Sequence, residues 1–570
     1  MVILGLNIGH DSSAAILADG SLLSACEEER YNKKKHTNDF PINAVNDCLK
    51  IAKLNISKVD IISVGFLPQK YIKEFLLKPA LDDHQMVSRV IEQAEKLKVY
   101  FNLEKIIKQK LKFKKKVEFN DHHMNHLAST YYPSNFKKSI VISYDGMGES
   151  ETGYFATANK GRIKVFHKKN LFPNSLGLIY AGITSYLGWK PNCDEGIIMG
   201  LASYGKPKDK IKGSNKTYID VFRDIIKQKS GLDFLINQDF ITYHKERDTW
   251  VSAKFIKLFG KRKKYNDKIT QNHKNIAAAL QLRLEEIVLS QLRYIKKKNP
   301  DYEHLCLAGG VALNCSLNGK IAQSKIFKKI FIQPASGDNG LAIGSAIVSF
   351  IKYKDYKNLN FLKYSYLGSS FDDREIIKIL QTYKNKIKFV KQKDIFSKTA
   401  SLISDGKIIG WFQGSAEFGP RALGNRSILC KPFPANMRDY INKKVKFREE
   451  FRPFAPAVLE ENQKDYFEIN QESPYMLIAC KIKKRVKKKL QATVHVDDTC
   501  RVQTVNKKYN KRFYSLIKKF YEKTNIPVLL NTSFNIKGQP IVNSPNDAVE
   551  CFLKYKIDYL VINDFIITKN

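Results

Sequence analysis

The chain has 570 residues, of which 43% are hydrophobic, and its formal net charge is +41 at pH 7. This length exceeds what one hydrophobic core supports, so two or three domains are expected. Nine cysteines without a CxxC pair argue against a disulfide framework or a zinc knuckle, and they favour the reducing cytoplasm. The apolar start at residues 2–6 is too short for a signal peptide, and the longest apolar stretch, 341–351, is too short to span a bilayer.

The excess positive charge is mostly lysine, in runs at residues 33–35, 114–116, 261–264 and 481–489. No recognised nucleic-acid-binding signature accompanies these runs. A solvated surface in a composition rich in Ile, Asn and Lys explains them, and a nucleic-acid or membrane-surface patch is the alternative. We therefore expect no membrane partner and do not expect nucleic acid to be the main partner. The oligomeric state is left open.

Two segments far apart in the chain share one pattern of strand, polar turn and strand. The first, VILGLNIGHDSSAAIL, begins at residue 2, and its tight turn presents His10 and Asp11. The second, SIVISYDGMGESETGYFA at 139–156, delivers Asp145 and Gly146 in the same way. Such a repeat indicates two related halves, which is the plan of the actin-like and sugar-kinase-like ATPases.

Four side chains form a candidate metal site. His122 and His126, in DHHMNHLAST, are four residues apart, so a helix would place both imidazoles on one face. Asp145 ends a strand, and Asp338 follows another apolar strand (330–332) in PASGDNGLAIGSA. Two His and two Asp suit Fe(II), Mn or Zn better than a thiolate site would. Ordinary polar helix residues are the alternative for the histidines, and His123 is an alternative ligand.

A glycine-rich turn lies in LCLAGGVALNCSLNGK at 305–320, after a long amphipathic segment at 275–298. An apolar strand runs into Gly309 and Gly310, and a helix follows. The missing Cβ atoms would allow a nucleotide to approach the backbone, and the helix N-terminus favours anions. This turn is therefore a candidate nucleotide contact.

Cationic side chains gather in four short segments between residues 411 and 535. These are WFQGSAEFGPRALGNRS (411–427), KFREEFRPFAP (446–456), HVDDTCRVQTV (495–505) and LLNTSFN (529–535). They carry Arg421, Arg426, Arg448, Arg452 and Arg501, beside Lys446, Ser533 and Asn535. Guanidinium forks bind phosphate oxygens with two hydrogen bonds, and a lysine adds a point charge. The alternative is a set of surface ion pairs.

The spacing within these segments predicts how they converge. Lys446 and Arg448 are two residues apart, as are Ser533 and Asn535, so on strands each pair would share a face. Apolar strands at 408–412, 528–530 and 559–562 predict a core for this part of the chain. Polar and glycine residues at 354–368 break the apolar pattern. We therefore expect one domain at 1–357 and a second at 358–570.

The ordered motifs resemble the nodulation- and antibiotic-tailoring O-carbamoyltransferases over nearly the full length. NIGHDSSAA, DHHMNHLAS, DEGIIMGLASYG, LAGGVALNCSLNGK, SGDNG, FGPRALGNRS, KFREEFRPFAP, HVDDTCRVQTV and LLNTSFN follow one another in that family's order. The resemblance implies an α/β protein. Its first domain would be a duplicated, actin-like (TsaD-like) carbamoyl-transfer domain, and its second an α+β, YrdC-like domain that forms carbamoyl-adenylate.

The resemblance implies a two-step reaction. Carbamoyl phosphate and ATP would form carbamoyl-adenylate in the C-terminal domain, and an acceptor hydroxyl would then attack the carbamoyl group in the N-terminal domain. His10 would act as base or hydrogen-bond donor, with Asp11 as the fallback. The metal would be a divalent ion, with Fe(II) expected at His122, His126, Asp145 and Asp338, and Mg could accompany ATP.

The expected cofactor-binding set combines both lines of reasoning: Lys35, Gly309, Gly310, Asn314, Arg421, Lys446, Arg448, Arg452, Arg501, Asn531, Ser533 and Asn535. For Lys35, in EEERYNKKKHTNDFP, an exposed lysine run is the alternative. Glu195, Met199 and Gly200 are expected on the acceptor side. A tRNA-modifying carbamoyl transferase or RNA-binding relative is the alternative function. A sugar kinase or ATPase would leave the C-terminal cations unexplained. The acceptor is a small molecule or glycan bearing a hydroxyl, and its identity is open.

Overall fold

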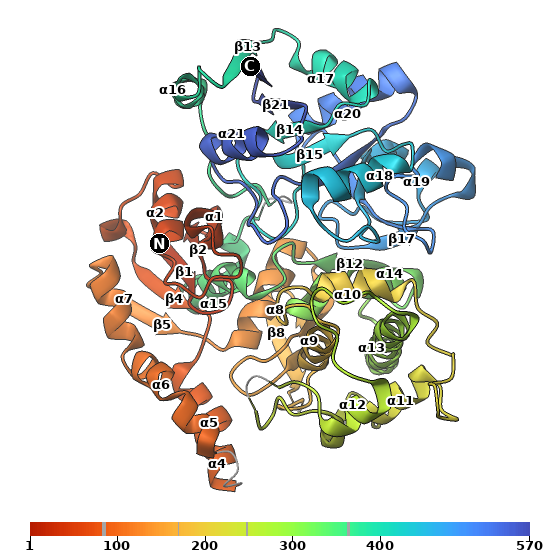
Figure 1. Cartoon of the computed structure of the whole chain (residues 1–570). Coiled ribbons are helices and arrows are strands. Elements are labelled where there is room, and N and C mark those ends of the chain that lie inside the picture. The colour runs from red at the N-terminus through yellow and green to blue at the C-terminus, as the bar shows by residue number, and fades with distance from the viewer. Residues whose placement is uncertain (83–86, 169, 247–248, 362–364) are drawn as a thin grey trace. The chain divides into compact units, whose positions relative to one another are not determined.

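The computed structural model describes residues 1–82, 87–168, 170–246, 249–361 and 365–570. The chain divides into two compact units (Figure 1). The first contains Met1–Leu22, Phe40–Ile42 and Lys53–Phe361, and the second contains Leu23–Asp39, Asn43–Ala52 and Leu362–Asn570. Residues 362–364 of the predicted boundary lie outside the described residues. In the described part of the chain, every helix is too short or too polar to cross a lipid bilayer.

The first unit begins with a five-stranded sheet in the order β3-β2-β1-β4-β5. Its strands are β1 (Val2–Asn7), β2 (Ser13–Ala18), β3 (Ser21–Glu27), β4 (Ile61–Val64) and β5 (Lys116–Phe119). The central strand β1 is antiparallel to β2, with Leu4 opposite Ile16, and parallel to β4. Its apolar side chains are buried, as expected for a strand covered on both faces.

A second sheet of the same unit repeats this topology, in the order β12-β11-β6-β7-β8. Its strands are β6 (Lys138–Tyr144), β7 (Gly153–Asn159), β8 (Arg162–His167), β11 (His304–Ala308) and β12 (Lys329–Ile332). In each sheet the first strand in the chain pairs antiparallel with the second and parallel with the fourth, and the fifth is parallel to the fourth. The shared topology agrees with the two related halves predicted from the strand–turn–strand repeat.

Helices α8 (His122–Ser134) and α15 (Leu341–Tyr353) join the two sheets. α8 follows β5 but packs against β6 and β11, whereas α15 follows β12 but packs against β1, β2 and β4. The helices also pack against each other, and a Cβ atom at Gly344 would lie 2.0 Å from the carbonyl oxygen of Asn125. Gly344 therefore permits an approach that any side chain would prevent.

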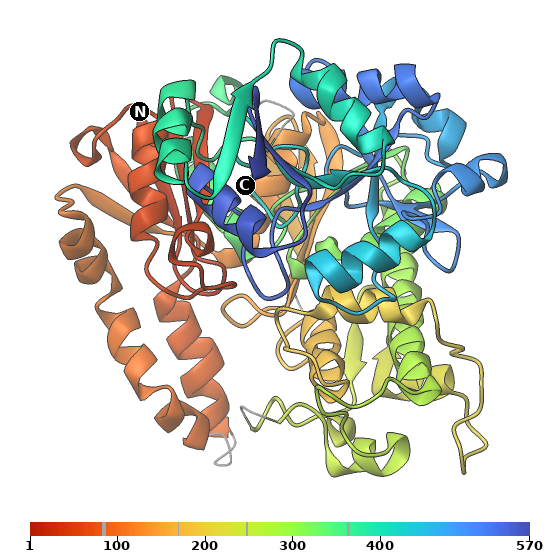
Figure 2. The ribbon, with the colours of Figure 1, turned by 45° about the horizontal axis from the view of Figure 1, so that its top comes forward.

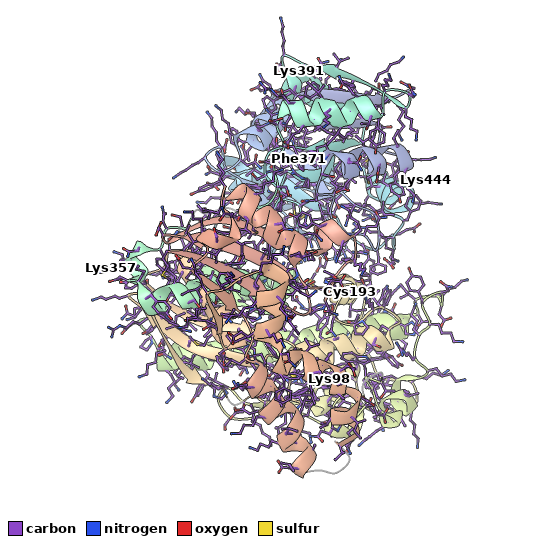
Figure 3. The ribbon with its side chains drawn as sticks, turned by 90° about the vertical axis from the view of Figure 1, so that its left-hand side faces the viewer. Lys98, Cys193, Lys357, Phe371, Lys391 and Lys444 are labelled. Carbon is purple, nitrogen blue, oxygen red and sulfur yellow. The ribbon has the colours of Figure 1, made fainter. Side chains whose placement is uncertain are left out.

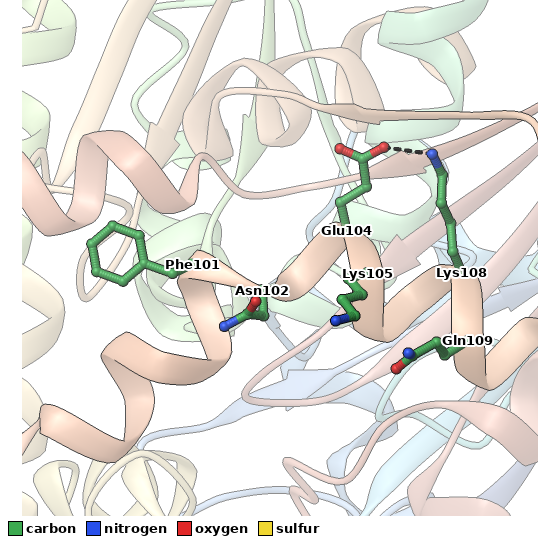
Figure 4. Close-up of a pocket in the computed structure, with 6 residues that line it drawn as sticks. All are labelled: Phe101, Asn102, Glu104, Lys105, Lys108 and Gln109. Atoms are coloured by element: carbon green, nitrogen blue, oxygen red, sulfur yellow. Dashed lines mark ion pairs between the residues drawn. The ribbon is translucent and has the colours of Figure 1, made fainter.

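Further helices surround the sheets. Between β4 and β5 lie α3 (Pro68–Lys70), the π-helix η2 (Tyr71–Leu77), α4 (Lys78–Asp82), α5 (Val87–Glu92), α6 (Ala94–Phe101) and α7 (Leu103–Leu111). Figure 2 shows them at the edge of the first unit, in orange. A shallow hollow along α6 and α7 is lined by Phe101, Asn102, Glu104, Lys105, Lys108 and Gln109, none of them a predicted site residue (Figure 4). Between β8 and β12 lie α9 (Leu176–Tyr186), α10 (Glu195–Ala202), α11 (Tyr218–Ile225), α12 (Ala253–Phe259), α13 (Gln271–Lys298) and α14 (Cys315–Gln323).

The second unit is built on a mixed eight-stranded sheet in the order β13-β22-β21-β14-β15-β20-β16-β19. In that order the strands are Ile387–Lys391, Phe565–Lys569, Tyr559–Ile562, Ile409–Phe412, Arg426–Cys430, Val528–Ser533, Ala455–Leu459 and Gln503–Val505. Its helices include α16 (Asp373–Thr382), α17 (Ile395–Ser404), α18 (Asn436–Ile441), α19 (Gln463–Tyr466), α20 (Lys511–Thr524) and α21 (Pro545–Lys554). Strands β17 (Ala479–Lys481) and β18 (Thr499–Arg501) form a separate pair. Phe412, Phe534 and Phe552 lie in the core.

An N-terminal segment belongs to this second unit. It holds most of β3, α1 (Glu29–Asn32) and most of α2 (Ile42–Ile51). Ala25 N–H donates to the carbonyl of Leu367 at 3.1 Å, and Lys33 forms an ion pair with Asp547 at 2.6 Å. Residues 23–39 and 43–52 were predicted as part of a domain at 1–357, but they pack with the C-terminal residues.

Candidate functional site

The structure brings the four predicted metal ligands together within the first unit. One ligand atom from each of His122, His126, Asp145 and Asp338 lies within 4.8 Å of all the others. The Nε2 atom of His122 lies 3.0 Å from Asp145 Oδ2, 3.1 Å from His126 Nε2 and 3.7 Å from Asp338 Oδ1. His126 Nε2 lies 3.5 Å from Asp145 and 3.7 Å from Asp338. Two imidazoles and two carboxylates can therefore meet one divalent cation.

Local structure explains each position in this cluster. Asp121 caps α8 by accepting from the N–H of Met124, so the two histidines lie one turn apart at the start of the helix. Asp145 directly follows β6, and Asp338 lies in a short 3-10 turn before α15. His123 bonds Ser143 and the carbonyl of Glu151 through its two ring nitrogens, and it is outside the cluster.

The glycine-rich turn supports this same cluster. The N–H of Gly310 donates to Asp145 Oδ1 at 2.9 Å, which leaves Oδ2 toward His122. Gly309 has φ of +85°, and a Cβ there would lie 2.1 Å from the carbonyl oxygen of Tyr144. Asn314 caps α14 and pairs with Gln281. In this structure the turn therefore holds a candidate metal ligand, a contact that the sequence pattern did not predict.

The carboxylates control the electrostatics of the cluster. Burial lowers the pKa of His122, but the hydrogen bond to Asp145 and the charges of Asp338 and Asp145 outweigh burial and raise it to about 9. Burial and the charge of His122 lower the pKa of His123 to about 4. A negative potential that holds a proton on His122 also attracts a metal cation. The proton and the metal would therefore compete for the same imidazole nitrogen.

The turn between β1 and β2 carries His10 and Asp11. His10 Nε2 lies 3.6 Å from Asp11 Oδ2, and the two side chains are 38% and 21% exposed. Asn7 donates to the backbone carbonyls of both residues. Ser13 Oγ donates to the carbonyl of Asn339 at 2.8 Å, which joins this turn to the one that carries Asp338. The predicted base and the metal-type cluster thus share one end of the two sheets.

In the second unit, Lys446 is one of the residues predicted to bind phosphate. It ends the π-helix η8 (Asn442–Lys446), and Phe447 then takes a left-handed conformation with φ of +48°. The pair Lys446 and Arg448 was expected on a strand, and that expectation is wrong. Lys446 Nζ still reaches the other pair, with 2.8 Å to the carbonyls of Ser533 and Asn535 and 2.7 Å to Asn535 Oδ1.

Several positive charges act on Lys446. Burial, followed by the charges of Arg448, Arg452 and Lys35, lowers the pKa of Lys446 well below its ordinary value. Burial and the charges of Arg452 and Arg501 likewise lower the pKa of Arg448. Within the described residues, neither Lys446 nor Arg448 forms an ion pair with a carboxylate. Glu449, one residue from Arg448, pairs with Lys537 at 2.7 Å and with Arg452 at 3.6 Å. Buried positive charge without a counter-ion is expected where an anionic ligand binds.

The remaining predicted residues have different surroundings. Arg448 donates to Asn442 and stacks on Phe454, with 4.5 Å from the guanidinium carbon to the ring centroid. Asn531 is 1% exposed and donates to Ala422 and Gln503. Arg421 is half-buried in the loop before β15. Arg426 is fully buried, where it donates to the carbonyls of Gln413, Gly414, Asn425 and Ser369 and packs on Phe412.

Sequence reasoning missed two residues that support the loop at 417–426. Glu417 Oε1 accepts three backbone N–H groups, from Leu423, Asn425 and Arg426. Arg30, from the N-terminal segment, donates to the carbonyl of Gly419 at 2.7 Å and pairs with Glu27. The glutamate lies inside a motif and could have been noticed there, but no local signal connects Arg30 to residues almost four hundred positions away.

Many lysines that create the high net charge are exposed. Lys98, Lys357, Lys391 and Lys444 are examples, labelled in Figure 3. Some are paired, as Lys391 is with Asp373 at 2.7 Å. None of the nine cysteines, all of which lie in the described ranges, forms a disulfide, and all but Cys193 are buried.

The fold and site define a two-unit α/β protein with a His/Asp cluster in one unit and, in the other, a buried lysine with half-buried cations near it. Two family models match the chain: "Carbamoyltransferase N-terminus" matches residues 2–347, and "Carbamoyltransferase C-terminus" matches residues 400–569. The chain belongs to the carbamoyltransferase family, whose members are transferase enzymes.

Similar proteins match between about half and nearly all of the chain. "Uncharacterized protein sll1178" of Synechocystis is 36% identical, over 98% of this chain and 95% of its own. "Nodulation protein NolNO" of Sinorhizobium fredii is 35% identical, over 98% of this chain and 79% of its own. "3'-hydroxymethylcephem-O-carbamoyltransferase" of Amycolatopsis lactamdurans is 31% identical, over 53% and 55%. Among solved structures, the (R)-2-hydroxyglutaryl-CoA dehydratase component A of Acidaminococcus fermentans covers 62% of this chain and 98% of its own, with 13% identity and a TM-score of 0.32.

Proposed function

We propose that this chain is an O-carbamoyltransferase that forms carbamoyl-adenylate from carbamoyl phosphate and ATP, and transfers the carbamoyl group to a hydroxyl of a sugar-containing or natural-product acceptor. Two named relatives, a nodulation protein and a cephem O-carbamoyltransferase, support the acceptor class. The observation that carries the adenylation step is the buried Lys446 with the half-buried cations Arg448, Arg452 and Lys35 near it. The repeated sheet topology supports an actin-like first unit, and we assign the second unit as YrdC-like.

The first step belongs to the second unit. Carbamoyl phosphate, water and ATP give carbamoyl-adenylate, pyrophosphate and phosphate. Arg448, Arg452 and Arg501 would bind phosphate oxygens with planar forks, and Lys446 would add a point charge. Because these groups are held before substrate arrives, they stabilise the charge that develops on the leaving pyrophosphate with little reorganisation.

The second step belongs to the first unit. The acceptor hydroxyl attacks the carbamoyl carbon of carbamoyl-adenylate. Its proton passes to a base, and AMP is the leaving group. His10 can accept that proton, and its Nε2 atom lies 3.6 Å from Asp11 Oδ2. His122, His126, Asp145 and Asp338 fit a divalent metal, with Fe(II) the expected ion. When bound, such a metal would supply a positive charge for phosphate or carbonyl oxygens.

The two steps can be separated with two variants. Without acceptor, Arg448→Met should release pyrophosphate about a hundredfold or more slowly, because a charge-assisted donor is lost where negative charge builds up. His10→Ala should still release pyrophosphate but should slow carbamoyl transfer to a hydroxyl acceptor. The exposed Lys444→Met serves as the control and should do neither. Normal pyrophosphate release from Arg448→Met together with loss in His10→Ala would mean that the steps are assigned to the wrong units.

A further inference from the structure

A buried carboxylate lies directly behind the His/Asp cluster. Glu149 is 0% exposed, and it lies in the loop that follows Asp145. Its Oε1 atom accepts the backbone N–H of His122 at 3.1 Å and that of Leu67 at 2.9 Å. One carboxylate oxygen therefore ties the first turn of α8 to the segment that follows β4.

The neighbouring Lys70 completes this connection. Its Nζ atom lies 2.7 Å from Glu151, 3.2 Å from Asp121 and 4.0 Å from Glu149. Asp121 is the cap of α8, and Tyr154 also donates to it at 2.8 Å. A single ammonium group thus joins the loop after Asp145 to the start of the helix that carries both histidines.

Packing fixes the same connection from outside. Lys70 is the last residue of α3, and the π-helix Tyr71–Leu77 begins next to it. Tyr71, Phe75 and Leu76 are buried in a cluster that also contains Met147 and Phe172. Ser150 donates to Glu74 of the π-helix at 3.0 Å. The π-helix therefore holds the loop at 145–151 through apolar and polar contacts, and irregular helices of this kind often occur at functional sites.

We propose that Glu149 is a positioning residue for the metal centre. It lies beside Lys70, the residue that directly precedes the π-helix. By accepting from His122 N–H and Leu67 N–H with one oxygen, it fixes the first turn of α8 relative to Asp145. In other metal sites, groups that form hydrogen bonds to the metal ligands orient those ligands and affect metal affinity. This inference rests on the proposed metal site, and it adds a part of the chain, residues 67–77, that contributes no ligand.

Metal affinity of the full-length protein tests the proposal. Protein stripped with a chelator is titrated with Co(II) in competition with a chromophoric chelator, and the visible Co(II) spectrum reports ligand geometry. Glu149→Ala should bind Co(II) about 10–100-fold more weakly and should change the spectrum. Glu149→Gln keeps a carbonyl oxygen in the same place, so its loss of affinity should be smaller. Urea unfolding of each metal-free variant identifies the conditions under which it is folded.

Two further variants make the outcomes distinguishable. Glu104→Gln changes an exposed carboxylate on the same group of helices, paired with Lys108, and should bind Co(II) as the wild type does. His122→Ala/His126→Ala should lose binding altogether. Wild-type affinity and spectrum in Glu149→Ala would overturn the role of Glu149 and would leave the metal site standing. Equal losses in the Gln and Ala variants would show that Glu149 acts through charge and would also overturn it. Binding unaffected by the double histidine variant would overturn the metal site itself.

Discussion

At the scale of single residues, Lys446 shows how burial prepares a binding group. The residue is 3% exposed, and its Nζ atom donates to neutral oxygens of Ser533 and Asn535. Burial and neighbouring cations disfavour its charged form, so an arriving phosphate group relieves an existing repulsion. The same arrangement makes ligand binding sensitive to pH.

Phosphate binding should be accompanied by proton uptake. In the free protein the pKa of Lys446 lies well below its ordinary value of 10.5, and a bound anion should raise it. Above the lowered pKa, the free lysine is partly neutral, so it takes up a proton when the anion binds, and affinity falls as pH rises through that range. Calorimetry of ATP binding in two buffers with different ionisation enthalpies measures the uptake. Lys446→Met should abolish it and the exposed Lys444→Met should not. Buffer-independent heats in the wild type at alkaline pH would contradict this prediction.

At the scale of elements, the two helices α8 and α15 decide whether the metal-type cluster forms. α8 carries two candidate ligands, and α15 begins beside a third, Asp338. Each helix packs on the sheet of the other half, so the two halves are held together where the ligands meet. At Gly344 the two helices are in close contact, and an added Cβ there would meet backbone atoms of Asn125 rather than a flexible side chain.

Gly344→Ala should therefore destabilise the protein and weaken metal binding together. The added methyl group would lie 2.0 Å from Asn125 O, so one helix must move, and overpacking of this kind costs about 1–3 kcal/mol or more. Gly196→Ala in α10 is the matched control, because nothing lies within 4 Å of its added Cβ. That control should be neutral or stabilising by about 0.5–1 kcal/mol. Urea unfolding measures the stability of both variants. Equal stability of the two would contradict the prediction.

At the scale of the whole molecule, the second unit combines an N-terminal segment with the C-terminal part of the chain. Residues 23–39 and 43–52 precede most of the first unit, yet they pack with the second. They contribute Arg30 to the loop at Gly419 and Lys35 to the charges around Lys446. We infer that the second unit requires segments from both ends of the chain.

A fragment of residues 365–570 should consequently be less stable than the second unit within the full chain. It lacks the hydrogen bond from Arg30 to Gly419, the ion pair of Lys33 with Asp547, and the buried Cys26 and Cys48. A synthetic peptide of residues 23–52 should bind the fragment and raise its thermal midpoint, and the same peptide with Arg30→Met should bind more weakly. Cooperative unfolding of the fragment at the full-chain midpoint, without peptide binding, would show that the C-terminal residues form an independent domain.

The sequence by itself determined the local elements and the family. Strands at 2–7, 138–144 and 559–562 follow from apolar runs bounded by turn residues, and the spacing of His122 and His126 follows from the period of a helix. The strand–turn–strand repeat predicted two related halves, whose sheets share one topology. These features depend on residues close together in the chain, which is why periodicity and turn chemistry reveal them.

Only the tertiary structure decided which distant segments meet. It gave Gly310 a bond to Asp145, placed Arg426 in the core, and put Lys446 at the end of a π-helix. It also brought the segment at 23–52 to the second unit and Glu149 to the first turn of α8. Such contacts depend on how whole elements pack against one another, and burial then fixes which polar group finds which partner. No local pattern contains that information, because the partners are separated by tens to hundreds of residues.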